Sequence, residues 1–407
     1  MSAAPSAAQA AREAVRDARS KFGGDARAKV AIVFASISYA DVAEVSALVR
    51  AELGDDVPIV GGTSGACVFG SERVSPRGVS VVLLGGDDVE VAYRTAACTS
   101  PTCMEVVPAA EEIARAADDA SGRGLEHYLC LVFAPSIFVD GEALVTAVRK
   151  GAGARAQLAG GLTGDDFTMD RPKVYIDGEL RDDRVVVAGV FTRRPIGIAA
   201  RHGWQAIGPV RAVTRSEGVW LCELDGRPAK DVWLEDARRA GASPPPDVKD
   251  LALYLANHYE IGITPEIKGR GGNGKKRYGK GGDTRELVAR APFAVREDGA
   301  MQLSAAIPEG THVCIIHATR NDLLRASTDA ATDAVLRAGN RVAGALVLAC
   351  SGRLAALGDS FSEEPKRIQK RIAAPIAGAC VFGEIARNVR DTDAFFNTTA
   401  VVVAFAV

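Results

Sequence analysis

Short runs of apolar residues alternate along the chain with amphipathic stretches of helical period. Residues 30–35 and 128–134 are brief, nearly continuous apolar runs, which predicts buried strands. Each run is followed by a segment with apolar residues every three or four positions, which predicts helices over residues 41–53 and 140–151. This alternation predicts an α/β fold of two lobes, with mixed β-sheets flanked by helices.

The chain contains an internal repeat. Residues 31–65 align with residues 130–164 at a constant offset of 99 without gaps, and ten positions are identical. The matches include Asp41 with Asp140, which are placed as helix N-caps, and the glycine pairs at 61–62 and 160–161. The alignment predicts a duplicated β-α-β unit that ends in a glycine turn.

A looser third copy is predicted near the end of the chain. Its first strand covers residues 345–350, its helix residues 363–371, its second strand and turn residues 374–378, and its paired strand residues 398–407. The extended segments after the first two glycine turns are predicted to form hairpins. These pair residues 78–84 with 89–94 and residues 184–191 with 196–202.

Three regions follow from these patterns. Residues 1–28 are an N-terminal helical segment, because Ala11, Val15, Ala18 and Phe22 recur at helical spacing. Residues 29–215 form the first lobe and residues 216–407 the second. Within the second lobe, residues 268–285 are rich in glycine and basic residues, so a flexible, solvated insert is expected.

Composition excludes several classes of protein. Of the 407 residues, 47% are hydrophobic and 25% charged, and the formal net charge is −2. The balance is that of a globular protein with no general attraction to nucleic acid. No apolar run reaches the roughly 18 residues of a membrane span. The eight cysteines form no Cys-x-x-Cys pair, which is typical of reduced thiols in a cytoplasmic protein.

Four short motifs stand out: Pro58-Ile-Val-Gly-Gly-Thr-Ser-Gly65, Ala159-Gly-Gly-Leu-Thr-Gly-Asp165, Gly378-Ala-Cys-Val-Phe-Gly-Glu384 and Phe396-Asn-Thr-Thr399. In their order and spacing they resemble the FIST family (F-box and intracellular signal transduction). The resemblance covers the N- and C-terminal FIST domains from about residue 10 onward. It implies a non-enzymatic sensory protein that binds a small ligand, with amino acids or related metabolites as the suggested class, and a signalling partner protein that carries the output.

Candidate ligand-binding residues follow from the rule that ligands gather beyond the carboxyl ends of parallel strands. Their hydroxyl, carboxylate and guanidinium groups suit the ammonium and carboxylate of an amino acid. The predicted set is Ser36, Ser38, Thr63, Ser64, Asp165, Asp166, Ser351, Arg353, Cys380, Glu384 and Asn397. No cofactor is indicated.

The alternative function is a Ser- or Cys-dependent hydrolase or acyl-transfer enzyme. Gly358-Asp-Ser-Phe361 resembles the start of an esterase signature, but no histidine follows it. His312 and Cys314 share one face of a predicted strand, where core packing is the commoner explanation. The histidine and cysteine spacings match no zinc pattern.

Overall fold

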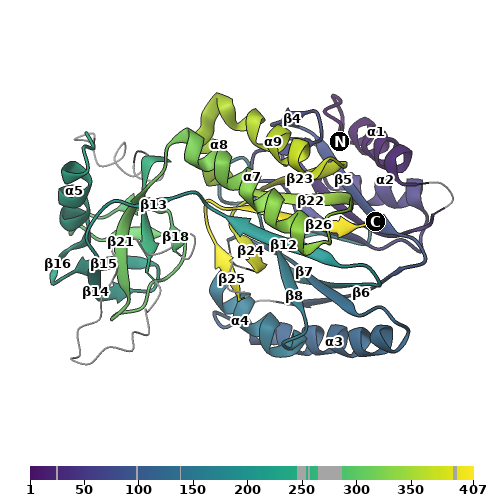
Figure 1. Ribbon diagram of the computed structural model, residues 1–407, viewed down its shortest axis with the longest axis horizontal. Helices are drawn as coiled ribbons and strands as arrows, with labels where there is room; N and C mark the ends of the chain where they lie inside the picture. Colours follow the sequence, from purple (N-terminus) through teal and green to yellow (C-terminus); the bar gives the residue numbers. More distant parts are fainter. Residues whose placement is uncertain are drawn as a thin grey trace.

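The computed structural model describes residues 1–23, 26–97, 100–137, 139–244, 254, 257–264, 287–387 and 392–407. Figure 1 shows a large body of layered sheets with helices on the outside, and a smaller β-rich part beside it. The predicted α/β class, with mixed sheets flanked by helices, is confirmed.

The first sheet is built around the first repeat unit. β1 and β2 are parallel neighbours joined through α2, and β5 pairs antiparallel with the other side of β1. The strand order is β10-β9-β2-β1-β5. The bounds are β1 Ala28–Ala35, α2 Glu44–Leu53, β2 Ile59–Thr63, β5 Val79–Gly85, β9 Val174–Ile176 and β10 Glu179–Arg181, with α1 (Ala7–Lys21) packed outside.

The second repeat unit forms a sheet with the same central arrangement. β7 and β8 are parallel and joined through α4, and the order is β25-β24-β8-β7-β11-β6. The bounds are β6 Val89–Ala97, η1 Met104–Val106, α3 Val107–Gly122, β7 His127–Pro135, α4 Gly141–Ala152, β8 Gln157–Thr163, β11 Arg184–Thr192, β24 Glu384–Arg387 and β25 Asp393–Phe396.

The third copy is confirmed as a full structural unit. β22 and β23 are parallel, and the order of their sheet is β12-β26-β22-β23-β3-β4. The bounds are β3 Val68–Gly70, β4 Val74–Ser75, β12 Ile196–Arg201, α7 Arg320–Arg337, β22 Val342–Cys350, α8 Ser351–Leu357, η3 Gly358–Ser362, α9 Glu363–Ile372, β23 Ile376–Val381 and β26 Ala400–Ala406.

The three units exchange strands in a cycle. After its second parallel strand, the first unit sends hairpin β3-β4 to the third sheet. The second unit sends β9-β10 to the first sheet, and the third sends β24-β25 to the second. Each sheet is therefore completed by another unit, which explains why the units form one body rather than separate domains.

Glycine permits the closest approach of the two parallel strands in each unit. A Cβ on Gly61, Gly160 or Gly378 would lie 2.1, 1.9 or 1.7 Å from the carbonyl oxygen of Val33, Val132 or Val347. Gly61 and Gly160 also have φ values of 126° and 146°, which side-chain-bearing residues rarely adopt. The repeated glycines are therefore required by the backbone.

A ring of backbone hydrogen bonds joins the three units where their parallel strands end. In each unit, the residue four positions after Gly61, Gly160 or Gly378 donates its N–H to a backbone carbonyl of the preceding unit. For the first unit, the preceding unit is the third. The bonds run from Gly65 to Cys380 (2.7 Å), from Gly164 to Thr63 (3.2 Å) and from Phe382 to Leu162 (2.8 Å). The three units thus have an approximate threefold arrangement at this end.

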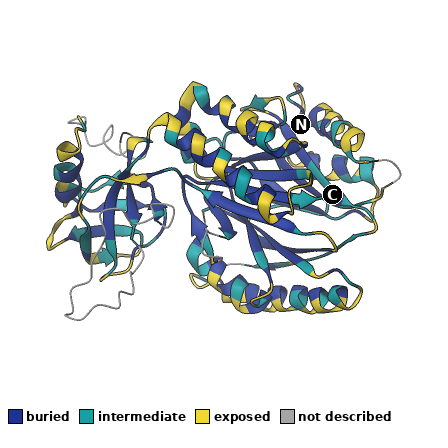
Figure 2. Cartoon of the chain, in the orientation of Figure 1, coloured by how far each residue is buried: buried dark blue, intermediate teal, exposed yellow. Residues whose placement is uncertain are grey.

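The inner faces of all three sheets share one apolar core. It includes Ile32, Leu131, Val186, Leu348 and Val403, all fully buried. The outer faces pack against helices in three further clusters: α1 with α2, α3 with α4, and α7 with α8 and α9. Figure 2 shows this arrangement, with buried strands inside and exposed residues on the outer helix faces.

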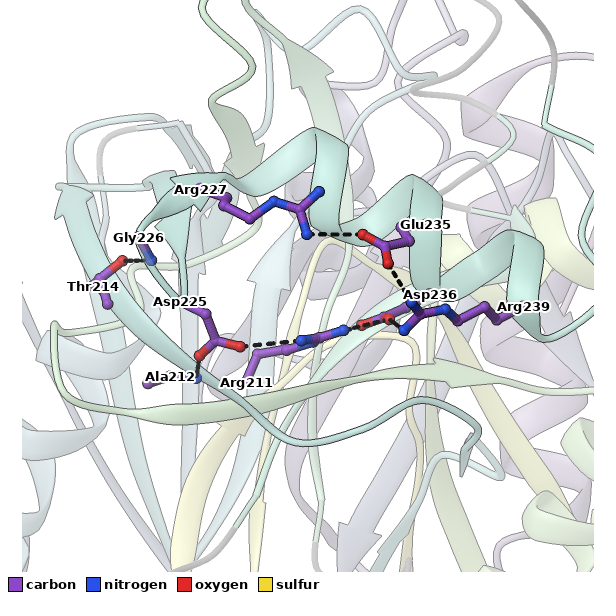
Figure 3. A network of polar contacts seen from close by, with 9 residues as sticks. All are labelled: Arg211, Ala212, Thr214, Asp225, Gly226, Arg227, Glu235, Asp236 and Arg239. Carbon is purple, nitrogen blue, oxygen red and sulfur yellow. Dashed lines mark hydrogen bonds and ion pairs between the residues drawn. The ribbon is translucent and has the colours of Figure 1, made fainter.

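The smaller part is a nine-stranded sheet that packs against α5 through Trp233. In Figure 3, the guanidinium of Arg211 joins β14 to α5, at 2.6 Å from buried Asp236 and 3.2 Å from Asp225. The bounds are β13 Gln205–Ala206, β14 Arg211–Glu217, β15 Trp220–Leu224, β16 Arg227–Pro228, α5 Ala229–Arg239, β17 Tyr259–Ile263, β18 Val288–Arg290, β19 Pro292–Val295, β20 Met301–Leu303 and β21 His312–His317.

Two sequence predictions about local structure are wrong. β5 and β6 lie in different sheets, as do β11 and β12, so neither pair is a hairpin. The short connections instead carry the chain from one sheet to the next. Asp140 caps its helix through the Ala143 N–H, but the N-cap of α2 is Ala43; the carboxylate of Asp41 accepts from the Ala7 N–H instead.

The expected boundary at residues 215 and 216 falls inside β14, within the smaller part. From α7 onward the chain returns to the body, where it supplies the third unit. The expected flexible insert at residues 268–285 lies outside the described residues.

Candidate functional site

The carboxyl ends of the parallel strands meet at the hydrogen-bonded ring, and several predicted site residues hold this ring together. The Thr63 hydroxyl donates to the carbonyl of Gly164 at 2.6 Å. The Ser351 hydroxyl donates to the carbonyl of Gly65 at 2.8 Å. Both side chains therefore connect one unit to another, which is a structural role.

Asp165 and Asp166 follow the second glycine turn and differ in electrostatic environment. Burial opposes ionisation of Asp165, but its carboxylate accepts N–H groups of residues 169–171 at 3.0 to 3.1 Å, and its pKa is lowered. Burial and the neighbouring Asp165 carboxylate raise the pKa of Asp166. Asp165 thus organises its own loop.

Ser36 and Ser38 lie after β1. Their hydroxyls are 2.8 Å apart, and Ser36 also donates to the Pro76 carbonyl at 3.0 Å. Ser64 is fully buried, and its hydroxyl has no hydrogen-bond partner among the residues that the structure describes.

Arg353 is a buried crosslink. It forms an ion pair with buried Glu364, and it donates to the carbonyls of His202 and Leu323 at 2.8 Å and of Thr398 at 3.1 Å. Residues 202 and 323 stand close to the two chain connections between the body and the smaller part. Arg353 therefore fixes these connections to the body.

Glu384 and Asn397 lie in a second polar group, where the body meets the smaller part. We call this group the junction cluster. Its members are Glu260 on β17, Arg290 on β18, Cys350 at the end of β22, Glu384 on β24, and Asn397 and Thr398 before β26. All six are at most 6% exposed.

The two carboxyl groups of the junction cluster are held by adjacent residues. Thr398 donates its hydroxyl to Oε2 of Glu260 at 2.8 Å, and the Thr399 N–H donates to Oε2 of Glu384 at 3.2 Å. Oε1 of Glu260 and Oε1 of Glu384 have no hydrogen-bond partner within the described part of the chain. A buried oxygen without a partner is costly, which makes both atoms candidate contacts for a ligand.

Burial dominates the electrostatics of the junction cluster. It raises the pKa of Glu260 to about 8, although the Thr398 hydroxyl and the nearby Arg353 and Arg290 oppose this. Burial is also the main cause that raises the pKa of Glu384 and of Cys350, and the Glu384 carboxyl further raises that of Cys350. At neutral pH, Glu260 and Cys350 are therefore held mainly in their uncharged forms.

Arg290 is the cation of the junction cluster. Its guanidinium pairs with Glu142, and one nitrogen lies 3.4 Å from Oδ1 of Asn397. Ser304 also donates to that oxygen, at 2.7 Å. The Nε atom of Arg290 has no partner among the described residues.

Sequence reasoning found Glu384 and Asn397 but missed Glu260 and Arg290. A usable signal was present, because each is a charged residue inside an otherwise apolar strand segment. Their convergence with Glu384 is not visible in the sequence, since β17 and β18 reach it from a separate sheet.

The buried thiols are poor nucleophiles. Burial raises the pKa of Cys130 and of Cys314 to about 12, and it raises the pKa of Cys380 beside Cys67. In the described ranges, no group of three or more His, Cys, Asp or Glu side chains is placed to hold a metal ion. The helices described there include none long and apolar enough to cross a membrane.

Comparison with protein families fits this architecture. The FIST N domain matches residues 29–227, and the FIST C domain matches residues 246–387. The chain belongs to the FIST family. The first match covers two of the repeat units of this FIST protein, and the second covers most of the third unit with part of the smaller sheet.

FIST domains are associated with sensory roles in signal transduction, and the family is not known for catalysis. No curated protein sequence matches this FIST chain significantly.

Proposed function

We propose that this FIST protein is a small-ligand-binding sensor in signal transduction, and that its ligand is an amino acid or related metabolite held at the junction cluster. One observation carries the proposal: Glu260 and Glu384 each keep a buried oxygen with no hydrogen-bond partner among the described residues. Natural proteins rarely leave such atoms unpaired, so a ligand donor is the expected complement.

The chemistry of the junction cluster suits a zwitterion. An ammonium group offers three donors to the two carboxyl oxygens, while a carboxylate can accept from the guanidinium of Arg290. The junction cluster also joins the body to the smaller part, and ligand sites commonly lie between such units. A ligand that contacts both the body and the smaller part would favour one position of the smaller part relative to the body. A signalling partner could then recognise that position.

The hydrolase alternative receives less support. Cys314 shares a strand with His312, but burial of the Cys314 thiol raises its pKa to about 12 and disfavours the reactive thiolate. A sensor should bind its ligand and leave it intact, whereas a hydrolase should consume it.

Calorimetric titration with the twenty amino acids tests the proposal. The intact chain should bind at least one of them, and Glu384→Gln should weaken that binding at least tenfold. Glutamine imitates the neutral carboxyl group, so it should preserve the fold while losing the charge that an ammonium group induces. Glu111→Gln, at an exposed position on α3, is the matched control and should bind as the unaltered chain does.

Binding should also depend on pH. Because the pKa of Glu260 is about 8, an ammonium ligand must displace a proton from that carboxyl at neutral pH. Affinity is therefore expected to rise between pH 6 and 8, with proton release measured by titration in buffers of different ionisation enthalpy. Binding that is indifferent to Glu384→Gln and to pH would place the ligand elsewhere.

A further inference from the structure

The first sheet has one strand position that the described chain does not fill. In the second sheet β6 pairs with the outer side of β11, and in the third sheet β12 pairs with the outer side of β26. β5 is the equivalent of β11 and β26, yet it stands at the end of its sheet. Among the described residues, the first sheet thus has five strands, whereas the second and third sheets of the body have six each.

A trace of the sixth strand is present. β6 precedes α3 and β12 precedes α7, so the equivalent strand would precede α1. There the structure has a single antiparallel bridge, from Ser2 to Val79 at the start of β5. Beyond it, no described strand pairs with the outer edge of β5 along residues 81–85.

A cavity of about 740 Å³ lies along this open edge. Its wall includes side chains that face the shared core from all three sheets: Val82 and Leu84 on β5, Val190 on β11 and Phe405 on β26. The volume is within the range of roughly 300 to 1,000 Å³ that is typical of ligand sites. The cavity is where the inward side chains of a sixth strand would pack.

We propose that the open β5 edge binds an extended peptide segment of a partner protein, which adds to the first sheet as an antiparallel strand. The outer edge of a terminal strand presents N–H and C=O groups that an added strand can pair, and alternate side chains of that strand would enter the apolar cavity. The segment therefore has apolar residues at every second position. Residues 81–85 span roughly 17 Å, enough for a strand of about five residues.

The two filled positions argue for a peptide over a small molecule. β6 and β12 occupy them as antiparallel strands, and each directs apolar side chains into the shared core, as Val91 and Ile198 do. A small molecule would fill the cavity but leave the edge of β5 unpaired. This interface is independent of the junction cluster and supplies a surface for the signalling output.

A tethered strand tests the proposal. The sequence of residues 89–94, taken from β6, is fused directly before Met1. It continues the Ser2–Val79 register, so its Val and Tyr at the third and fifth positions lie opposite Leu84 and Val82. The Ser2–Val79 pair is joined by two backbone hydrogen bonds, so the ladder donors of the fused strand lie opposite residues 81, 83 and 85. The control fusion carries proline at the fourth and sixth positions, opposite Leu83 and Val81, which removes two of these donors. Both fusions alter the amino terminus equally.

Relative to the control, the strand fusion should slow amide exchange in residues 81–85 at least tenfold and raise the unfolding midpoint by about 2–4 °C. A fluorescein-labelled peptide of the same sequence should bind the unfused chain, and the strand fusion should weaken this binding at least tenfold. Equal exchange in the two fusions, or equal peptide binding to fused and unfused chains, would overturn the proposal. N-phenyl-1-naphthylamine, an uncharged apolar probe, provides a further test: saturable binding that the strand fusion leaves unchanged would assign the cavity to a small molecule instead.

Discussion

At the residue scale, the protein places ionisable groups where their charged forms are disfavoured. Glu260 is the clearest case, because it is fully buried and its pKa rises from an ordinary value of 4.5 to about 8. Such a carboxyl binds a proton more tightly in the folded state than in the unfolded state. Its contribution to stability is therefore fully present below pH 4.5 and is lost as the pH rises through 8.

Glu260→Gln should remove this dependence. The variant keeps a neutral group that can accept the Thr398 hydroxyl, so its stability should nearly match that of the unaltered chain at pH 5. At pH 8 to 9 the variant should be more stable, by on the order of 2–4 kcal/mol. Urea unfolding at several pH values measures the difference. If the two chains lose stability in parallel between pH 5 and 9, the raised pKa of Glu260 is not the cause.

At the scale of elements, the close approach of the parallel strands depends on glycine. Gly160→Ala should be severely destabilising, because the added Cβ would lie 1.9 Å from the Val132 carbonyl oxygen and φ is 146°. We expect a loss of about 3 kcal/mol or more in the free energy of unfolding. Gly153→Ala is the matched control: its φ is 75° but no atom lies within 4 Å, so it should cost only about 1 kcal/mol. If Gly160→Ala and Gly153→Ala lower the free energy of unfolding equally, the backbone shifts enough to avoid the contact between the new Cβ and the Val132 carbonyl oxygen.

Elements and repeats were predictable from the sequence to the extent that local pattern determines them. The central strands of all three units, and the helices α4 and α9, lie where apolar periodicity placed them. The exchange of hairpins β3-β4, β9-β10 and β24-β25 was not predictable, because strand pairing between distant segments leaves no local pattern. Glu384 and Asn397 were recognised because they stand in sequence motifs near the end of the chain. Their neighbours Glu260 and Arg290 were missed because they reach the junction cluster from another sheet.

At the scale of the whole molecule, three units share one core and a separate sheet is inserted between the second and third units. Arg353 links the body to the smaller part. It donates hydrogen bonds to the carbonyl groups of His202 and Leu323 near the two chain connections, and to that of Thr398 in the junction cluster. Its charge is balanced by buried Glu364. The position of the smaller part against the body should therefore depend on the ion pair between Arg353 and Glu364.

Arg353→Met should lower the free energy of unfolding by about 3–5 kcal/mol, because it leaves the Glu364 carboxylate buried and unpaired. Adding Glu364→Gln should recover part of this loss, since the unpaired charge is removed, although the three carbonyl groups remain without their donor. A double-mutant cycle from urea unfolding measures the coupling, and amide exchange in β17 and β21 reports on the smaller part. If the pair fixes the connections, exchange there should increase in both variants, even where overall stability is recovered. If the two substitutions lower the free energy of unfolding additively and leave exchange in β17 and β21 unchanged, Arg353 does not hold the smaller part against the body.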